Sequence, residues 1–417
     1  MNSLATATAD PAEQVDYKSV ALLSAAHLCD DINQGVLPAM LPFFISAYHL
    51  TYAAAAGLVL AQTLSSSVVQ PLFGLWADRH SSPWLIPVGM SFAGLGVALT
   101  GLAPTYALIF ISIAVSGFGI SAFHPEAARR VRYLSGSRQA TTMSLFTVGG
   151  MVGFALGPLV ITPTLIALGT RGALVLTIPV LVMAVVLTSN LHRLVAVEPS
   201  AKPEIKGRVI IEGEERWSDF GRLTAVVVLR SMAFFGLNTF LPLYWTAHLH
   251  GTKTGGGMAL TALAVSVALG TLIGGRLADR YGRKIVIAGS LAAFVPLLLI
   301  FVNSRIFVAA IMLLPIGIAA AAANSVVVVM AQDYLPNRVG LAAGVTLGLS
   351  MTIGGMLTPV LGTIADHYGL TTAMFLVAVI PSLAFAMSLT LHETAGETVR
   401  LEMAAGAVQS PATTGGR

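Results

Sequence analysis

Long apolar runs, separated by short polar stretches, follow one another along almost the whole chain. A helix that crosses a bilayer needs about 20 mostly apolar residues. By this measure the pattern predicts an all-α polytopic membrane protein with about twelve spans, at residues 20–47, 53–77, 84–103, 105–131, 139–168, 171–191, 223–248, 257–278, 285–302, 306–332, 340–366 and 369–391.

The first run begins near Val20, behind a polar leader of mixed charge at residues 1–19. A cleaved signal peptide has a basic start and a short apolar core that ends at a small-residue site. Here the apolar run extends to about Tyr48, so we interpret it as a retained membrane helix preceded by a cytoplasmic leader.

Basic residues are distributed unevenly among the connections between spans. Cytoplasmic loops of membrane proteins carry an excess of Lys and Arg. If the N-terminus is cytoplasmic, the outer connections hold only Arg171, Lys253 and Arg305. The inner connections then hold a larger set, which comprises Arg79, Arg129, Arg130, Arg132, Arg138, Arg280, Arg283, Lys284, Arg338 and the basic residues of the 193–222 stretch. This asymmetry predicts that both termini lie in the cytoplasm.

One connection, at residues 193–222, is long and polar, and it divides the predicted spans six and six. We therefore predict two six-helix bundles, at residues 20–192 and 223–392, joined by a cytoplasmic linker. We interpret the linker as a solvated connection. We expect the tail at residues 393–417 to be cytoplasmic and disordered.

The two halves repeat each other at a spacing of about 200 residues. Corresponding segments are Leu41-Pro42 with Leu241-Pro242, Gly74–Arg79 with Gly275–Arg280, Gly117 with Gly317, Arg138 with Arg338, and Gly157-Pro158 with Thr358-Pro359. Matches in register at equivalent points of a six-plus-six layout indicate gene duplication. Parallel six-helix repeats are the layout of major facilitator transporters, which this chain resembles.

The segment Gly275–Lys284 resembles the loop motif of the major facilitator superfamily, G-x-L-a-D-r-x-G-r-k. The first-half copy keeps Gly74 and Asp78-Arg79 and then departs from the motif. In such a loop the carboxylate can accept hydrogen bonds from a neighbouring helix N-terminus and pair with the arginines beside it. We predict a cytoplasmic gate formed by Asp78, Arg79, Arg130, Asp279, Arg280 and Arg283. The alternative is a topological anchor without a gating role.

Several further segments resemble the fosmidomycin-resistance family of exporters. They are His27–Asp31, Gln70-Pro71, Phe123–Glu126, Ser144–Gly150 with Gly157-Pro158, and Gln332–Arg338. The resemblance implies a proton-driven antiporter of the bacterial inner membrane that exports a small drug such as fosmidomycin, an anionic phosphonate, by alternating access. The chain departs from common drug exporters in its fourth span, where His124 and Glu126 stand in place of a deep arginine, and in its fifth, where no glycine pair follows Pro158.

Composition narrows the class further. Hydrophobic residues make up 55% and charged residues 10% of the 417 positions, and the mean hydropathy is +0.81. A soluble domain carries about 25% charged residues, so a soluble protein is excluded. Cys29 is the only cysteine, which excludes an internal disulfide and a cysteine-based metal cluster. We expect no cofactor, no metal site and no nucleic-acid partner, and a monomer whose partners are the lipid bilayer, protons and a small-molecule substrate.

Ionisable residues inside the predicted spans are few, and each is a candidate for function, because a charge in the bilayer core costs about 2.5 kcal/mol or more. His27, Asp31 and Gln34 follow an i, i+4, i+7 spacing and share one helix face. Asp30 lies about 15–18 Å along the helix from Lys18, near the midplane. We predict that His27, Asp30 and Asp31 couple protons. For His27 the alternative is a structural hydrogen bond within the bundle.

Arg230 stands 200 residues after Asp30, at the equivalent place in the second repeat. We predict that the acidic residues and Arg230 confront each other across the two bundles, with the guanidinium binding an anionic substrate bidentately. Binding of the substrate to Arg230 would weaken the ion pair between Arg230 and the acidic residue, and the acidic residue could then take up a proton. The alternative is a permanent structural ion pair between the bundles.

His124 and Glu126 lie two residues apart in the fourth span and cannot share a helix face. We predict that both belong to the proton path or to the inner gate. Because Glu126 precedes Arg130 by one helical turn, the alternative for Glu126 is a plain i, i+4 ion pair.

Neutral polar residues complete the predicted substrate site. The candidates are Gln34, Gln62, Ser66, Gln70, Asn238 and Asn324, of which Gln62, Ser66 and Gln70 form an i, i+4, i+8 stripe. Each can instead tie helices together. We interpret the small residues at 149–153 and 354–355 as sites where helices pack closely.

Other functions agree less well with the sequence. The chain contains no H-E-x-x-H, P-loop or G-x-S-x-G motif, so we do not expect an enzyme. Duplicated halves with midplane charges favour alternating access over a channel or a receptor. A proton-coupled importer or exchanger of a small organic anion stays open as the alternative, because the same fold suits either direction.

Overall fold

The structure is a computed structural model that describes residues 15–80, 82–135, 138–195, 214–338, 341–342 and 344–393. All regular elements in these residues are helices. The first fourteen residues of the predicted leader, most of the predicted linker and the predicted disordered tail from residue 394 lie outside the described residues.

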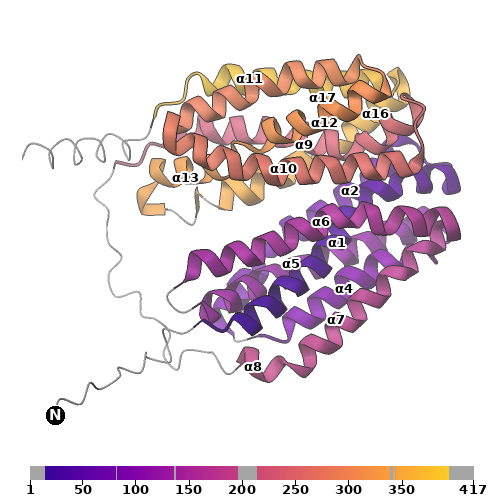
Figure 1. Cartoon of the computed structure of the whole chain (residues 1–417), viewed down its shortest axis with the longest axis vertical. Helices are drawn as coiled ribbons and strands as arrows, with labels where there is room; N and C mark the ends of the chain where they lie inside the picture. Colours follow the sequence, from indigo (N-terminus) through magenta and orange to yellow (C-terminus); the bar gives the residue numbers. More distant parts are fainter. Residues whose placement is uncertain are drawn as a thin grey trace, which may run out of the picture.

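The N-terminal bundle contains α1 to α8 (Figure 1). Its elements are α1 Tyr17–Tyr48, α2 Tyr52–Ser67, α3 Gln70–Arg79, α4 Leu85–Leu99, α5 Tyr106–Leu134, α6 Gln139–Leu168, the 3₁₀ helix η2 Gly169–Leu176, α7 Thr177–Ser189 and α8 Leu191–Val195. Polar side chains start several of these helices because the first amide groups of a helix need acceptors. Asp16 Oδ1 accepts from the amides of Lys18 and Ser19, at 3.1 Å each.

The C-terminal bundle contains α9 to α17. Its elements are α9 Trp217–Ala247, α10 Lys253–Tyr281, α11 Arg283–Val302, α12 Ile306–Ala321, α13 Asn324–Tyr334, η3 Pro336–Arg338, the π-helix η4 Gly344–Leu349, α15 Ser350–Met356, α16 Thr358–Tyr368 and α17 Leu370–Ser388. Each predicted span coincides with one helix or with consecutive helices. The second, tenth and eleventh spans are interrupted, between α2 and α3, between α12 and α13, and between α15 and α16. The seventh begins at Trp217 rather than at the predicted residue 223.

Nine helical stretches among the described residues are long and apolar enough to cross a membrane. The shorter α4 and the helix α1, which carries Asp30 and Asp31, are not among them. Many large apolar side chains point outward, such as Phe307, Val185 and Leu72. An outer surface of this kind is suited to contact with lipid, since a soluble protein rarely exposes large continuous apolar patches.

The helix pair α1 and α6 packs closely at the centre of the N-terminal bundle. A Cβ atom on Gly153 of α6 would lie 2.2 Å from the carbonyl oxygen of Leu28 on α1. Only glycine therefore allows the two backbones to approach so far. This agrees with the close-packing role predicted for the glycines at 149–153, and it positions the middle of α1 against α6.

Among the described residues, the contacts between the two bundles extend from one end of the molecule to about mid-helix, as at Ala155 of α6, which bonds with Thr261. We call the end that holds Leu194 and Arg216 the linker end, and the end that holds Tyr48 and Lys253 the far end. At the far end Lys253 Nζ donates to Ser46 Oγ of the other bundle at 3.2 Å. Nearer the middle of α6, the Ala155 carbonyl accepts from Thr261 Oγ1 at 2.8 Å.

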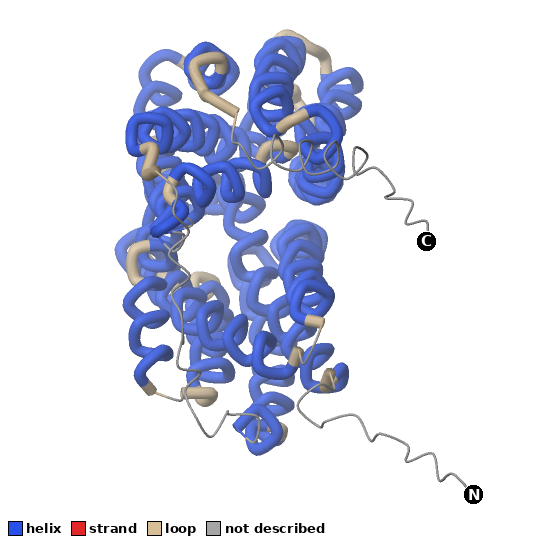
Figure 2. The backbone as a smooth tube through the Cα atoms, turned by 90° about the vertical axis from the view of Figure 1, so that its left-hand side faces the viewer, coloured by secondary structure: helices blue, strands red, loops and turns tan. Residues whose placement is uncertain are grey.

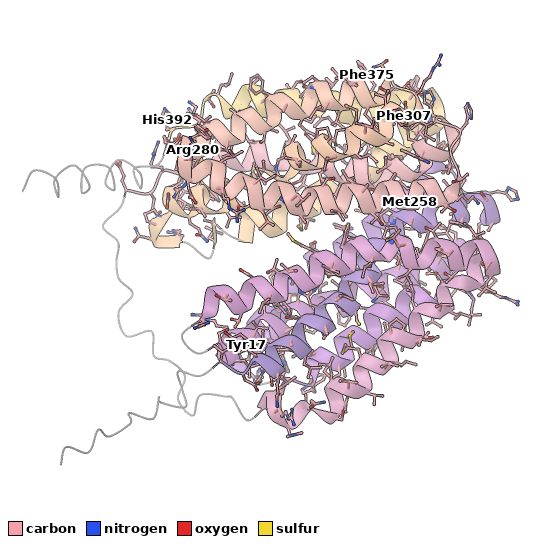
Figure 3. The ribbon with its side chains drawn as sticks, in the orientation of Figure 1. Tyr17, Met258, Arg280, Phe307, Phe375 and His392 are labelled. Carbon is pink, nitrogen blue, oxygen red and sulfur yellow. The ribbon has the colours of Figure 1, made fainter. Side chains whose placement is uncertain are left out.

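The figures show the same arrangement. The ribbons of the two bundles lie close at the far end and diverge toward the linker end (Figure 1). Viewed from the linker end, an upper and a lower group of helices are apart on the right of the view and adjoin on the left (Figure 2). Tyr17, Arg280 and His392 mark the linker end, and Met258 and Phe307 the far end (Figure 3). The fold thus places the middle of α1 between a closed end and a divergent end.

Candidate functional site

Three ionisable side chains converge at the middle of α1. His27 Nε2 lies 3.3 Å from Asp31 Oδ2 one turn along the same helix. His124 of α5 reaches the same carboxylate, with Nε2 3.2 Å from Asp31 Oδ1. The two imidazole Nε2 atoms are themselves 3.2 Å apart. We call His27, Asp31 and His124 the imidazole–carboxylate cluster.

Backbone carbonyls hold both imidazole rings of this cluster. His27 Nδ1 lies 2.8 Å from the carbonyl oxygen of Phe146 on α6, whose ring stacks on the imidazole at 4.1 Å between centroids. His124 Nδ1 lies 2.9 Å from the carbonyl oxygen of Ile120, one turn earlier on α5. A carbonyl only accepts hydrogen bonds, so it fixes the proton of the ring on Nδ1.

Gly150 on α6 leaves the space that the cluster occupies. A Cβ atom there would lie 2.5 Å from Asp31 Oδ2 and 2.5 Å from His27 Nε2. On the other side of the carboxylate, Gln34 Nε2 donates to Asp31 Oδ1 at 2.7 Å. The predicted common face of His27, Asp31 and Gln34 is therefore confirmed by their mutual contacts.

Asp30 lies beside the cluster and is fully buried. Neither carboxylate oxygen of Asp30 has a hydrogen-bond partner among the described residues. Its Oδ2 lies 3.6 Å from His124 Nδ1. An ionised carboxylate without hydrogen bonds is costly in apolar surroundings unless a positive charge is near. Asp30 therefore makes a cation at the cluster favourable.

The cluster is also the one group of ligating side chains in the described residues whose geometry could hold a metal ion. One ligand atom each from His27, Asp31 and His124 lie within 4.8 Å of one another. The sequence alone gave no reason to expect such a group, because His124 comes from a different helix.

Glu126 does not join the cluster. Its buried carboxylate accepts from Arg129, at 3.0 Å for each of two bonds, and from Arg130 Nε at 2.8 Å. Arg130 also donates to the carbonyl of Leu194 at 2.9 Å. Glu126 therefore forms the ion pair with Arg130 that was the alternative for it. Through the bond of Arg130 to Leu194, this pair lies toward the linker end.

Arg230 on α9 has partners within its own bundle. Its Nη1 donates to the carbonyl of Ala320 at 2.8 Å and to Asn324 Oδ1 at 2.6 Å. The predicted confrontation with Asp30 and Asp31 is wrong for this conformation, because among the described residues neither acid pairs with Arg230. The Ala320 carbonyl and the Asn324 side chain, near the break between α12 and α13, accept from Nη1 of Arg230, while the two imidazoles contact Asp31.

The remaining polar candidates are dispersed. Gln62 Nε2 donates to the carbonyl of Asn33 at 3.1 Å, which ties α2 to α1, and Ser66 Oγ donates within its own helix to Thr63. The stripe predicted to continue to Gln70 is interrupted where α2 ends at Ser67. Asn238 lies within α9 and is partly buried.

The predicted gate residues lie at the linker end, where their described contacts stay within one bundle. Arg283 pairs with Asp333 of α13. Asp279 and Arg280 are exposed. The amides that begin α11 are capped by Glu393, which accepts from Arg283 and Lys284 at 3.1 and 3.0 Å. In this conformation, in which the bundles diverge at the linker end, Asp279 caps no neighbouring helix among the described residues, and its gating role stays a prediction. The side chains of Asp78 and Arg79 lie outside the described residues.

One contact between the bundles was missed by sequence reasoning. Asp366 of α16 accepts from the amides of Tyr52 and Ala53 at the start of α2, at 2.7 and 3.0 Å. A signal was present, because Ala365–Gly369 repeats the pattern A-D-x-Y-G of the motif segment Ala278–Gly282. The motif-like carboxylate of the far end, rather than Asp279, is the one that caps a helix of the other bundle.

Comparisons of the sequence with family models and with known proteins all indicate one family. The family model of the Major Facilitator Superfamily matches residues 23–244 and 223–413. The fosmidomycin resistance protein of Escherichia coli (strain K12) is 30% identical over 364 residues, covering 87% of this chain and 89% of that protein. The uncharacterized MFS-type transporter YfnC of Bacillus subtilis (strain 168) is 28% identical over 373 residues, covering 88% and 91%.

Among solved structures, a bacterial homolog to the human lysosomal transporter Spinster, in an inward-facing and occupied conformation, is similar with a TM-score of 0.74. The sequence identity is 15%, and the match covers 89% of this chain and 95% of that one. This likeness supports the fold.

Proposed function

The chain belongs to the Major Facilitator Superfamily, and from this premise we propose that it is a proton-driven antiporter that exports a small anionic, phosphonate-like compound such as fosmidomycin. Its relatives are membrane transporters, so the chain is a multi-pass membrane transporter and not an enzyme. The likeness to a fosmidomycin resistance protein supports the substrate class.

The observation that carries the proton role is the imidazole–carboxylate cluster with buried Asp30 beside it. Imidazole and carboxylate groups are the side chains that gain and lose protons in the membrane core of transporters. His27, Asp31 and His124 lie in mutual contact, so a proton can pass among them without leaving the cluster. Glu126 is held by two arginines and has no part in this path.

Arg230 is the group we assign to the anionic substrate. It is a partly buried cation on α9, at the place equivalent to Asp30 on α1. Its Nε atom has no hydrogen-bond partner among the described residues. Because this Nε atom is buried, a phosphonate oxygen can accept from it only after a change of conformation exposes it, while Nη1 keeps its bond to Asn324. Because Arg230 and the cluster are separate here, we place their coupling in the change of conformation rather than in a direct ion pair.

We assign the linker end to the cytoplasm, because the basic connections gather there, as the positive-inside rule requires. The far end is closed by hydrogen bonds between the bundles. This arrangement is an inward-facing one, open to take up substrate from the cytoplasm. We place the protein in the bacterial inner membrane as a monomer with cytoplasmic termini.

The experiment uses everted membrane vesicles whose interior is acidified by respiration, with a fluorescent weak base as the reporter of the pH gradient. Fosmidomycin added outside should dissipate the gradient only in vesicles that contain the protein. Asp31→Asn should abolish this response. Glu214→Gln, which neutralises an exposed carboxylate outside the helices, is the matched control and should leave it intact.

Arg230→Ala tests the substrate role in the same vesicles. Hydrogen bonds to charged groups contribute about 1.5–3 kcal/mol, so the half-maximal fosmidomycin concentration should rise about 10- to 100-fold. A normal response from Arg230→Ala would refute the substrate role, and intact proton release from Asp31→Asn would refute the proton role. If fosmidomycin binds but releases no protons, the alternative of an importer or exchanger of organic anions takes its place.

A further inference from the structure

The two imidazole rings of the cluster present the same atom to each other. Both Nδ1 atoms donate to backbone carbonyls, of Phe146 and Ile120. Each neutral ring then carries only a lone pair on Nε2. The two Nε2 atoms are 3.2 Å apart, so two lone pairs face each other. Such a pair is stable only when a positive charge lies between or beside the nitrogens.

The distances within the cluster match those between ligands of one metal ion. Zinc binds imidazole nitrogen and carboxylate oxygen at about 2.0–2.2 Å in tetrahedral geometry, which sets its ligand atoms roughly 3.3 Å apart. In the cluster the edge between the nitrogens is 3.2 Å, and the nitrogen–oxygen edges are 3.3 Å and 3.2 Å. Three ligand atoms therefore form a nearly equilateral triangle of the required size.

The surroundings are those of a metal site rather than of a packed hydrogen-bond network alone. Metal-bound histidines donate their other ring N–H to a carbonyl or a carboxylate, as both rings do here. With both rings neutral, Asp30 and Asp31 bring two negative charges, which one divalent cation would balance. Asp30 is fully buried and has no hydrogen-bond partner among the described residues. The side chains of His124 and Asp31 are 20% and 14% exposed, which leaves a path for an ion.

We propose that the Nε2 atoms of His27 and His124 and the carboxylate of Asp31 bind one divalent transition-metal ion of the zinc class. Two imidazoles and a carboxylate suit Zn²⁺ or Co²⁺, whereas Mg²⁺ and Ca²⁺ require oxygen ligands. Three protein ligands leave a fourth position open for water or for an anionic group. The inference concerns binding at the same cluster and does not depend on export.

The test is metal binding by the purified full-length protein in detergent. Zn²⁺ affinity is measured by competition with a chromophoric chelator, and Co²⁺ is added to read the coordination geometry from its absorption. We expect one ion per chain at micromolar concentration, with the intense visible absorption of tetrahedral cobalt. His124→Gln should weaken Zn²⁺ binding at least 10- to 100-fold, because substitution of a residue that only hydrogen-bonds to a metal ligand already weakens binding by that much.

Two further variants keep the result interpretable if His124→Gln folds poorly. Gly150→Ala retains every ligand but places a methyl group 2.5 Å from Asp31 Oδ2 and His27 Nε2, so it should also weaken binding at least tenfold. His392→Gln removes the other described imidazole that contacts a carboxylate, that of Asp219, and should leave binding unchanged.

Three outcomes would overturn the proposal. One is the absence of Zn²⁺ binding to the wild-type protein at tens of micromolar, which would leave the cluster to protons alone. The others are equal affinity of the wild-type, His124→Gln and Gly150→Ala proteins, and loss of binding in His392→Gln only. A vesicle assay that fails while Zn²⁺ binds would contradict the antiport proposal and not this one.

Discussion

The substitution Asp366→Ala removes a contact that exists only while the far end is closed. Asp366 of α16 accepts hydrogen bonds from the amides of Tyr52 and Ala53, and Thr51 Oγ1 accepts from the next amide, that of Ala54. The start of α2 is therefore capped partly by its own segment and partly by the other bundle. When the bundles separate at the far end, only the cap from Thr51 stays with α2.

The expected size of the effect follows from the geometry. A side-chain cap at a helix N-terminus contributes about 0.5–2 kcal/mol, and a carboxylate at the positive end of the helix dipole adds about 0.3–1 kcal/mol at an exposed position. Asp366 is exposed, so we take about 1–2 kcal/mol in total. This energy stabilises only the far-end-closed state, so its loss should shift the equilibrium toward opening about 5- to 30-fold.

The assay is the labelling rate of a single buried cysteine by a membrane-impermeant maleimide. Ala56 is 1% exposed, and its carbonyl accepts from Thr358 of the other bundle at 3.4 Å. Ala56→Cys is therefore protected while the far end is closed. In a Cys29→Ser background, Asp366→Ala should increase the labelling rate about 5- to 30-fold, in proportion to the open population.

The matched control is Glu214→Ala, which removes an exposed carboxylate at the linker end that belongs to no predicted gate or site and should not change the rate. A labelling rate that Asp366→Ala leaves unchanged would refute the reasoning. The cap would then be replaced by water at no cost, and the packing of α2 against α15 and α16 alone would keep the far end closed.

Two further predictions concern stability. Glu126→Gln removes the negative charge that pairs with the buried Arg130 and should destabilise the N-terminal bundle by about 3–5 kcal/mol. The measurement is the midpoint of thermal unfolding in detergent, which should fall. An unchanged midpoint would show that the Leu194 carbonyl alone is enough to stabilise the Arg130 guanidinium. Gly153→Val places side-chain atoms against the Leu28 carbonyl and should abolish the monodisperse peak in size-exclusion chromatography. Gly221→Val, where a Cβ meets nothing within 4 Å, is its control and should elute normally.

The fold could be predicted almost completely from the sequence, because hydropathy acts locally. A bilayer requires each crossing segment to satisfy its own backbone hydrogen bonds, so an apolar run of sufficient length becomes a helix whatever its neighbours are. The breaks after Ser67 and Ala321 were not predicted. The break after Ser67 has a local cause, because Pro71 has no amide hydrogen to donate to the Ser67 carbonyl one turn earlier. At the second break a side chain of another helix takes part, since Arg230 donates to the carbonyl of Ala320.

The part of the candidate site that lies on a single helix could be predicted from the sequence. The spacing of His27, Asp31 and Gln34 determined by itself that these side chains share one face, and the cost of burying charge singled them out. The choice of partner was decided only by the tertiary structure. A helix can turn about its axis and tilt toward any neighbour, so the sequence could not say that His124 of α5 would complete the cluster or that Arg230 would bond within its own bundle. The sequence determined which side chains share a helix face. The close packing of α6 against α1 at Gly150 and Gly153 determined which faces meet.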